Sequence, residues 1–336
     1  IVKSSYISFE QELRFQQGAK NLESDYDSGW SLFDRFGTKD FNPLFIFFLL
    51  IAFAILVAPV NLFYFAKAGR RHRLFITTPI ISVATCLLIV AVIFFMDGVG
   101  GSGMRVVLAD LQPSAGETRT YLTQEQVSRT GVMVNSGFEA PQPYDLNPVS
   151  LPASRFNPLT PYAQRSDFYD IAGAQFSGPF FRSRSEQGFS LRSVEPGRAR
   201  IEYAGTEDGK PKLVSNLSQE ITALQYRDAD GALWRTPAGT RVGPGQTIPL
   251  ERLEKETWPD WAMESAGFFS KSRQILVRRL QFDRHRYFAQ VADPTAFALP
   301  THPGIRWSET HLLLTGTPSG ATSSGTAPTP QPDADE

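Results

Sequence analysis

Two long apolar stretches dominate the hydrophobic pattern of the chain. Pro43–Phe65 and Leu74–Met96 each run for 23 residues without Asp, Glu, Lys, Arg or His. At about 1.5 Å of rise per residue, each would form a helix of about 35 Å, long enough to cross a hydrocarbon core of about 30 Å. We therefore predict an α-helical membrane hairpin, with transmembrane helices at 42–66 and 74–97.

The segment between the two stretches sets the expected orientation. This basic loop, 67–73, has no acidic residue, and positive charge beside a span is retained on the cytoplasmic side. We predict a cytoplasmic loop, both termini extracytoplasmic, and a location in the cytoplasmic (inner) membrane of a bacterium, whose lipid bilayer is the first partner. The topology determinants are Lys67, Arg70, Arg71 and Arg73.

Polar and small residues inside the two stretches indicate how the helices meet. In an antiparallel hairpin that turns near Gly69, Asn61 lies at the depth of Thr78, and a threonine hydroxyl can satisfy a buried amide. Pro59 removes a backbone hydrogen bond and predicts a kink. An ion path is the alternative interpretation of these groups, but two helices cannot enclose one. The predicted helix–helix contact comprises Ala54, Ala58, Asn61, Thr78 and Ser82.

The end of the first stretch carries a family resemblance. The run Val57-Ala58-Pro59-Val60-Asn61-Leu62, followed by Gly69-Arg70-Arg71, resembles a group of poorly characterised bacterial two-span membrane proteins. Their first span ends in a "GPVN"-like motif, with Ala58 standing here in place of its glycine. The resemblance covers residues 43–135. It implies an envelope location, a basic cytoplasmic turn and an outer β-rich domain, but no catalytic residues.

After the second stretch the pattern changes to short alternating segments typical of strands. Six residues, 98–103, are rich in glycine and predict a flexible linker. Residues 104–316 then predict a mainly-β extracytoplasmic domain, an antiparallel β-sandwich with one helix at Ser265–Leu280. Two Asp-Gly pairs, at Asp208 and Asp230, are typical of hairpin turns.

Three further segments carry no regular pattern. Residues 1–41 are interpreted as the end of an upstream extracytoplasmic region, because the chain starts at Ile1. The aromatic-rich stretch 139–183 predicts a long ordered loop, a frequent location for binding. Residues 317–336 lack large apolar side chains and predict a disordered tail.

The sequence contains no recognisable catalytic or metal-binding motif. Cys86 is the only cysteine, and the four histidines (His72, His285, His302 and His311) lack metal-ligand spacing. The Asp228–Gly231 run faintly resembles a calcium loop but fits a hairpin turn better. We expect no catalytic residue, cofactor or metal. The pattern leans away from an enzyme but leaves open one with scattered residues.

A basic run near the C-terminal third is the one candidate binding patch. It is either a solvated helix face or a patch for an anionic envelope polymer, lipid head groups or an acidic partner. We predict that Trp258 and Trp261 nearby form the lid of a core, which means that they cover its apolar side chains. Contact with a bilayer is the alternative. The candidate patch consists of Lys271, Arg273, Arg278, Arg279, Arg284 and Arg286.

These patterns together favour a binding function over a catalytic one. The net charge is −1 and no region is strongly basic, which excludes nucleic acid as an expected partner. We expect a membrane-anchored, non-enzymatic cell-envelope scaffold or protein-binding subunit. The alternatives are a module that binds carbohydrate or an anionic polymer, or a support for an enzymatic or sensory domain upstream of residue 1.

Overall fold

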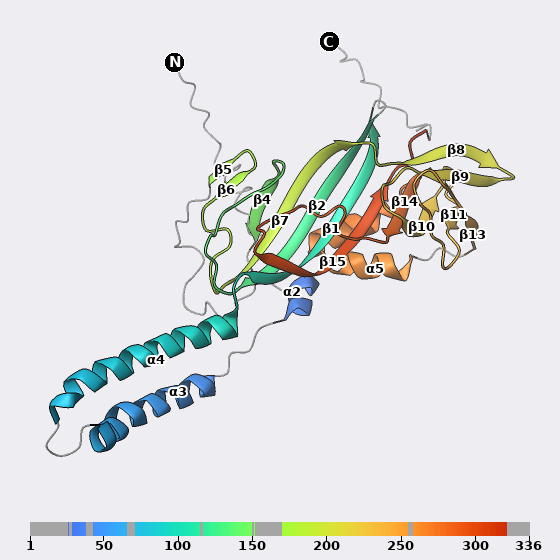
Figure 1. The fold of residues 1–336 in the computed structure, drawn as a ribbon. Helices are drawn as coiled ribbons and strands as arrows, with labels where there is room; N and C mark the ends of the chain where they lie inside the picture. The colour runs from blue at the N-terminus through green and yellow to red at the C-terminus, as the bar shows by residue number, and fades with distance from the viewer. Residues whose placement is uncertain are drawn as a thin grey trace, which may run out of the picture.

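The computed structural model describes residues 26, 29–37, 43–65, 71–114, 117–149, 151, 170–254 and 258–320. These residues form a helical hairpin and a larger unit rich in β-structure, which we call the β-domain (Figure 1). The β-domain contains the described residues at 26–37 and 98–320.

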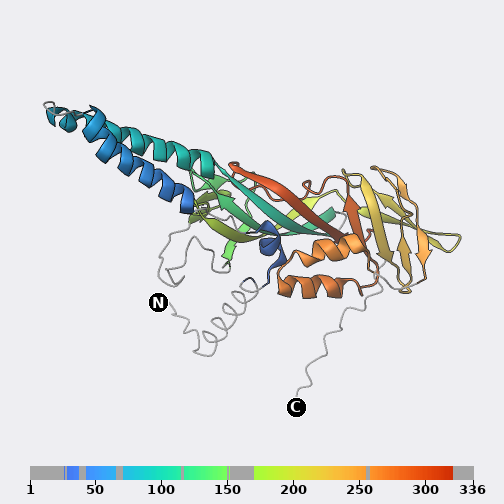
Figure 2. The same ribbon diagram turned by 90° about the horizontal axis from the view of Figure 1, so that it is seen from below.

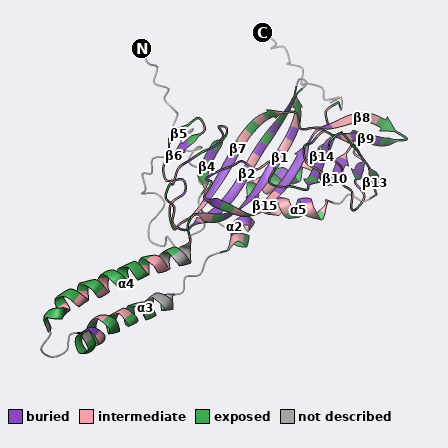
Figure 3. Ribbon diagram, in the orientation of Figure 1, coloured by how far each residue is buried: buried purple, intermediate pink, exposed green. Residues whose placement is uncertain are grey.

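The hairpin consists of two helical arms whose side chains are largely exposed (Figure 3). Each arm is long and apolar enough to cross a membrane. Pro59 lies in a π-helical stretch, which accommodates a residue that cannot donate a backbone hydrogen bond. In order, the elements are α3 (Pro43–Ile55), η1 (Leu56–Phe65), η2 (Arg71–Arg73) and α4 (Leu74–Asp97).

A nine-stranded sheet forms the centre of the β-domain, in the order β13-β11-β10-β14-β15-β1-β2-β7-β4. The sheet is mixed, because β1 runs parallel to β15, so the predicted antiparallel sandwich is wrong in this respect. The strands are β1 (Gly101–Ser114), β2 (Glu117–Thr130), β4 (Asp145–Val149), β7 (Glu186–Gly197), β10 (Ile221–Arg227), β11 (Leu233–Arg235), β13 (Glu251–Leu253), β14 (Arg286–Val291) and β15 (Ile305–Gly316).

Helices cover one face of this sheet, and two small sheets cover the other (Figure 2). Strand β1 is buried on both faces, with Val106 turned to the helices and Val107 to the small sheets. The covering elements are α2 (Ser31–Phe36), α5 (Asp260–Gly267), α6 (Lys271–Leu280), β3 (Phe138–Glu139), β5 (Asp170–Ala172), β6 (Gln175–Ser177), β8 (Ile201–Glu207), β9 (Lys210–Ser215) and β12 (Thr247–Ile248).

The segment before the hairpin belongs to the same β-domain as the segment after it. Trp30 is 1% exposed, and its indole nitrogen donates to the Phe268 carbonyl at 3.1 Å. Leu32 and Phe33 of α2 are buried in the same core as strand β1. This part of the predicted upstream region is therefore integral to the β-domain. Residues 1–25 of that prediction lie outside the described part of the chain.

The glycines after α4 do not form the predicted linker. Gly101 opens strand β1, and its nitrogen donates to the Gly304 carbonyl at 2.9 Å. A Cβ on Gly103 would lie 2.6 Å from the Trp307 ring and 2.7 Å from the Val127 carbonyl oxygen. Glycine is thus required here by the close approach of strands and an aromatic ring.

Several other predicted elements differ from the structure. The helix predicted at Ser265–Leu280 is two helices, α5 and α6, separated by residues 268–270. The stretch 139–183 contains short strands where it is described, and its residues 150 and 152–169 lie outside the description. Ser319, from the predicted disordered tail, donates its backbone N–H to Ile201 at 2.8 Å, while 321–336 are not described.

The Asp-Gly turns are present as predicted. Asp208 and Gly209 join β8 to β9 with φ values of 50° and 74°, the positive values that a two-residue hairpin loop of this type needs. Asp228 accepts the backbone N–H of Asp230 at 3.0 Å and of Ala232 at 2.8 Å. The second run is therefore a side-chain-supported turn.

The close packing at Gly103 gives a first prediction. Gly103→Ala should lower the free energy of unfolding by about 1–3 kcal/mol, because its methyl group would overlap a ring and a backbone oxygen. Gly197→Ala is the matched strand control, since its nearest neighbour would lie 3.9 Å away. Thermal unfolding of the full chain in detergent measures both. Equal stability of the two variants would contradict the packing argument.

Candidate functional site

A buried carboxylate connects three parts of the β-domain. Glu125 lies on β2 between Val106 of β1 and Ser190 of β7, and its side chain is fully buried on the helix side of the sheet. The backbone N–H and the hydroxyl of Ser270 donate to it at 2.7 and 2.8 Å. The Tyr26 hydroxyl donates at 3.2 Å. The segment before the hairpin, the sheet and the start of α6 therefore meet at one group.

This arrangement explains why the predicted single helix is interrupted. Ser270 directs both of its donors to Glu125 instead of capping α6. The carbonyls left at the end of α5 are partly satisfied by Gln274, whose amide donates to Gly267 at 2.9 Å and Phe269 at 2.7 Å. The carbonyls at and just after the end of α5 thus keep a hydrogen-bond donor despite the break.

Burial sets the protonation equilibria of this cluster. Desolvation raises the pKa of the Glu125 carboxyl, while the Ser270 donors, the Arg273 guanidinium at 3.7 Å and the Tyr26 hydroxyl oppose that rise. Burial, with the nearby Glu125 charge, raises the pKa of Tyr26 to about 12. Tyr26 therefore remains a neutral hydrogen-bond donor at physiological pH.

A second buried polar group lies on the other face of the same strand. The amide nitrogen of Gln124 donates to Gln126 at 2.7 Å and to the Leu299 carbonyl at 3.1 Å, and its oxygen accepts the Leu299 N–H at 2.8 Å. Gln124 thus fixes the chain segment between β14 and β15 on the sheet. Sequence analysis missed this polar run, because the alternating pattern predicts strands at Thr118–Leu122 and Thr130–Asn135 and leaves 123–129 between them. The apolar residues on both sides of 124–126 were the sequence feature that could have indicated one continuous strand.

The structure divides the predicted basic patch. Arg273 turns inward toward Glu125, and the buried Arg286 pairs with Asp110 at 3.0 Å and Asp283 at 3.2 Å. Arg278, Arg279 and Arg284 are exposed. Lys271 is also exposed, but it interacts with another residue of the chain. Arg273 and Arg286 therefore form ion pairs within the β-domain, and they do not belong to the exposed basic patch.

The exposed part of that patch also carries apolar side chains. Ile275 and Leu276 on α6 are 54% and 51% exposed, and Phe282 just beyond it is 63% exposed. We call Lys271, Ile275, Leu276, Arg278, Arg279, Phe282 and Arg284 the α6 face. A surface that combines arginine with apolar and aromatic side chains has the composition of a protein interface.

The aromatic lid and the polar part of the helix contact are present where the sequence predicts them. Trp258 and Trp261 pack, partly buried, against the core below α5 and α6. Asn61 is buried and donates to Thr78 at 2.9 Å, and it accepts from Thr77 at 2.6 Å. This pairing joins η1 to α4 at the depth expected from the sequence.

The small residues predicted to line the hairpin contact are more exposed than Asn61. Ala54 and Ala58 are exposed, and Ser82 is half-buried. The polar contact at Asn61 therefore contributes more to holding the arms together than a seam of small residues does. Among the topology determinants, Arg71 and Arg73 lie in η2, whereas Lys67 and Arg70 fall outside the described residues.

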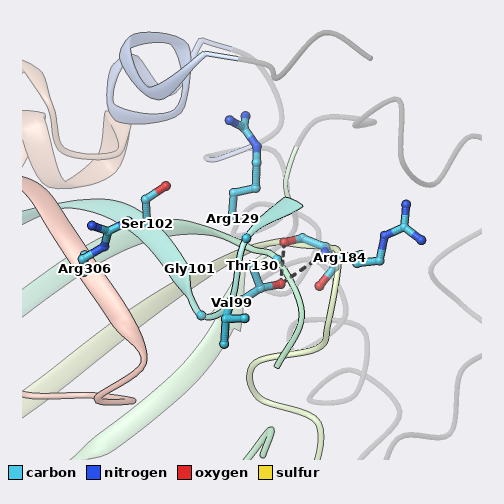
Figure 4. A pocket seen from close by; sticks show the side chains of 11 residues that line it. Val99, Gly101, Ser102, Arg129, Thr130, Arg184 and Arg306 are labelled. Carbon is cyan, nitrogen blue, oxygen red and sulfur yellow. Dashed lines mark hydrogen bonds between the residues drawn. The ribbon is translucent and has the colours of Figure 1, made fainter. Parts of the chain in front are cut away.

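A pocket lies where α4 enters the sheet. It has a volume of about 290 Å³, and Gly98–Ser102, Thr130, Gly131, Ser185 and three arginines line it. Figure 4 shows Arg184 and Arg306 on opposite sides of the pocket, with their guanidinium groups pointing away from each other. Arg129 pairs with Glu186 at 2.6 Å and stacks over Phe36. The three guanidinium groups do not converge on one ligand.

The histidines serve separate local contacts. His302 is buried beside Phe181 and accepts the Gly304 N–H at 3.0 Å, and burial lowers its pKa. His311 stacks on Phe268, with ring centroids 3.9 Å apart. His285 has φ 54° and lies 3.3 Å from the Tyr226 hydroxyl. The described residues contain no group of three or more His, Cys, Asp or Glu placed to hold a metal ion.

Glu125 gives a prediction with a defined sign. Because its pKa is raised in the folded state, the native chain holds this proton more tightly than the unfolded chain. The stability it contributes is present at low pH and falls as the pH rises above the ordinary pKa of glutamate. We expect the difference in unfolding temperature between wild type and Glu125→Gln to shift against wild type as the pH rises above about 4.

The other titrating groups are present in both proteins, so their contributions cancel in the difference in unfolding temperature. Wild type and Glu125→Gln therefore need no further reference variant. Circular dichroism melts of the full chain in detergent at each pH provide the measurement. A difference that instead moves in favour of wild type as pH rises would show that Ser270 and Arg273 outweigh burial.

Comparison of the chain with protein-family models, with curated proteins and with solved structures gave no match in any of the three.

Proposed function

We propose that the chain is a membrane-anchored, non-enzymatic scaffold or protein-binding subunit of a bacterial cell envelope. In this proposal α3 with η1 and α4 cross the cytoplasmic membrane, the basic loop is cytoplasmic, and the β-domain with both termini is extracytoplasmic. The apolar composition of both arms and the four positive charges between them support this orientation.

The observation that carries the proposal is the attachment of the hairpin at both ends. Trp30 and α2, which precede α3, are buried in the β-domain, and the chain enters the central sheet at Gly101 after α4. Attachment on both sides of the hairpin limits the rotation that a single Gly-rich tether would allow. A domain held in this way keeps one orientation to the membrane, which is a property suited to a scaffold.

The α6 face is the surface best suited to a protein partner. Its exposed isoleucine, leucine and phenylalanine bury apolar area in a complex, while the arginines surrounding them make polar contacts. An anionic polymer is the alternative occupant, and it would depend on the arginines more than on the apolar side chains.

Labelling of single cysteines tests the orientation. In a Cys86→Ala background, a membrane-impermeant maleimide should label Asp208→Cys in intact spheroplasts but not Gly69→Cys. The first position is an exposed β-turn, and the second lies in the basic loop. Permeabilised cells provide the control in which both positions react. Labelling of Gly69→Cys from outside would contradict the proposed topology.

Charge and apolar variants of the α6 face distinguish the two kinds of partner. If the occupant is an anionic polymer, Arg278→Gln, Arg279→Gln and Arg284→Gln together should weaken its capture at low salt. That loss should shrink as salt rises, because exposed charges are screened over about 8–10 Å.

If the occupant is a protein, the wild-type chain should not capture an anionic polymer. Leu276→Ser with Phe282→Ser should then abolish site-specific photo-crosslinking of a partner protein from position 279 in cells. Arg241→Gln, which is exposed on another part of the β-domain, is the matched charge control. Salt-sensitive polymer capture lost only in the triple arginine variant would favour the alternative function.

A further inference from the structure

Part of the helix side of the central sheet is exposed. Tyr121 on β2 and Val194 on β7 are 43% and 55% exposed, and they are direct cross-strand partners. Each lies four residues from the Glu125–Ser190 pair on the same two strands, so both side chains point to the helix side. Paired residues have Cβ atoms about 4.5–5.5 Å apart, so Tyr121 and Val194 form one continuous surface.

This surface adjoins the core beneath the helices. Leu108 on β1 belongs to that core and is the diagonal neighbour of Tyr121, because its own partner on β2 is Thr123. Arg119 and Arg192 lie on the same face of the sheet, both exposed, and their aliphatic stems extend its apolar area. We call Arg119, Tyr121, Arg192 and Val194 the open face. An exposed apolar surface that borders a core suits the packing of a further segment.

The chain before α2 runs toward the open face. Trp30 lies beside Gly188 of β7, where an added Cβ would be 3.3 Å from its ring. Tyr26 lies further along β7, with its hydroxyl beside Ser190, and its ring is in edge-to-face contact with Trp30. From residue 30 back to residue 26 the chain therefore advances from Gly188 toward Val194. The chain that precedes Tyr26 leaves the described part at the border of the open face.

The other segment that leaves the described part on this side starts from the opposite end. β4 runs antiparallel to β7, so from Asp145 to Val149 it moves away from the open face. Leu151, which follows β4, is buried beside Gly188, at the Trp30 end. The position of Leu151 therefore does not direct the following chain onto the open face, whereas the position of residue 26 does so for the preceding chain.

The sequence of residues 1–25 suits this location. Val194 is four strand residues, about 13 Å, from the level of Tyr26, a distance that a short stretch of extended chain spans. The segment also carries large apolar and aromatic side chains, which gain free energy when they are buried on an apolar surface. These side chains are Tyr6, Ile7, Phe9, Leu13 and Phe15.

We propose that residues 1–25 pack on the open face and complete the helix side of the central sheet. The occupant is this segment because it continues directly from Tyr26, which Glu125 holds beside the face, and because the direction from Trp30 to Tyr26 leads onto it. The chain before the hairpin then belongs to the β-domain from residue 1 to residue 37. This inference does not depend on the membrane anchorage proposed above.

Photo-crosslinking of the full chain in detergent tests what covers the open face. p-Benzoylphenylalanine replaces Tyr121, and mass spectrometry identifies the cross-linked peptides after proteolysis. We expect intramolecular cross-links to residues 1–25, and none to that segment from the same probe at Val134, which is 97% exposed between β2 and β3. Cross-links to residues 152–169 or to a second copy of the chain, or no cross-link at all, would overturn the proposal.

The reactivity of a cysteine on the open face measures the same contact. In a Cys86→Ala background, Val194→Cys should react slowly with a hydrophilic maleimide. Replacing apolar side chains of residues 1–25 by serine should increase that rate several-fold, because the replacement removes the apolar area that holds the segment on the sheet. The residues replaced together are Ile7, Phe9, Leu13 and Phe15.

Two controls accompany this measurement. Gln16→Ser with Gln17→Ser alters the same segment without removing apolar area and should leave the rate at Val194→Cys unchanged. Val134→Cys should react fast in every variant. A rate at Val194→Cys that equals that at Val134→Cys, or that is unchanged in the quadruple serine variant, would overturn the contact. The cross-linking experiment uses the unaltered segment, so it decides the question if the quadruple variant does not fold.

Discussion

The carboxylate of Glu125 is the interaction on which the assembly of the β-domain depends. Burying a carboxylate costs several kcal/mol unless donors surround it. Here those donors come from Tyr26 before the hairpin and from Ser270 between α5 and α6, with Arg273 close by. These donors reduce the cost only when all these segments are in place, so the cluster favours one arrangement of helices on the sheet. Tyr26 lies 99 residues from Glu125 in the chain, and the hairpin fills most of that interval.

The hairpin is therefore an insertion into a folded unit, and its two arms leave from neighbouring parts of that unit. On one side α2 packs against β1 and β2, and on the other the backbone of Gly98–Gly101 is bonded to Val132 and Gly304. The Asn61 contacts with Thr77 and Thr78 join the arms at their opposite end. Contacts at both ends of the arms limit how far the hairpin can open or turn, which is the mechanical basis for the scaffold proposal.

The parts of this architecture that could be predicted from sequence are those governed by local chemistry. The apolar arms follow from length and composition. The turns at Asp208 and Asp228 follow from residues that tolerate positive φ or accept backbone N–H groups. Strands β10 and β15, with bounds Ile221–Arg227 and Ile305–Gly316, follow from their alternating pattern. Asn61 could be paired with Thr78 because the short turn fixes the register of an antiparallel hairpin.

The errors arose where distant residues decide local structure. Gly101 and Gly103 look like a linker because the Ile305 and Trp307 side chains that lie against them come from about 200 residues further along the chain. The Gln124–Gln126 run looks like a loop because its partners, Leu299 and Ser270, come from far along the chain. Arg273 and Arg286 look like part of a basic surface because their acidic partners, Glu125 and Asp110, lie on other strands.

Removing these two arginines from the basic run changes what kind of surface remains. Arg273 and Arg286 would have extended the positive charge toward the sheet, but their charges are compensated inside the β-domain. The exposed arginines that remain on α6 alternate with Ile275, Leu276 and Phe282, so the α6 face is as apolar as it is basic. A polyanion gains little from apolar side chains, whereas a folded partner gains from burying them. The same pairing that builds the core thus leaves an α6 face that suits the proposed protein partner better than a charged polymer.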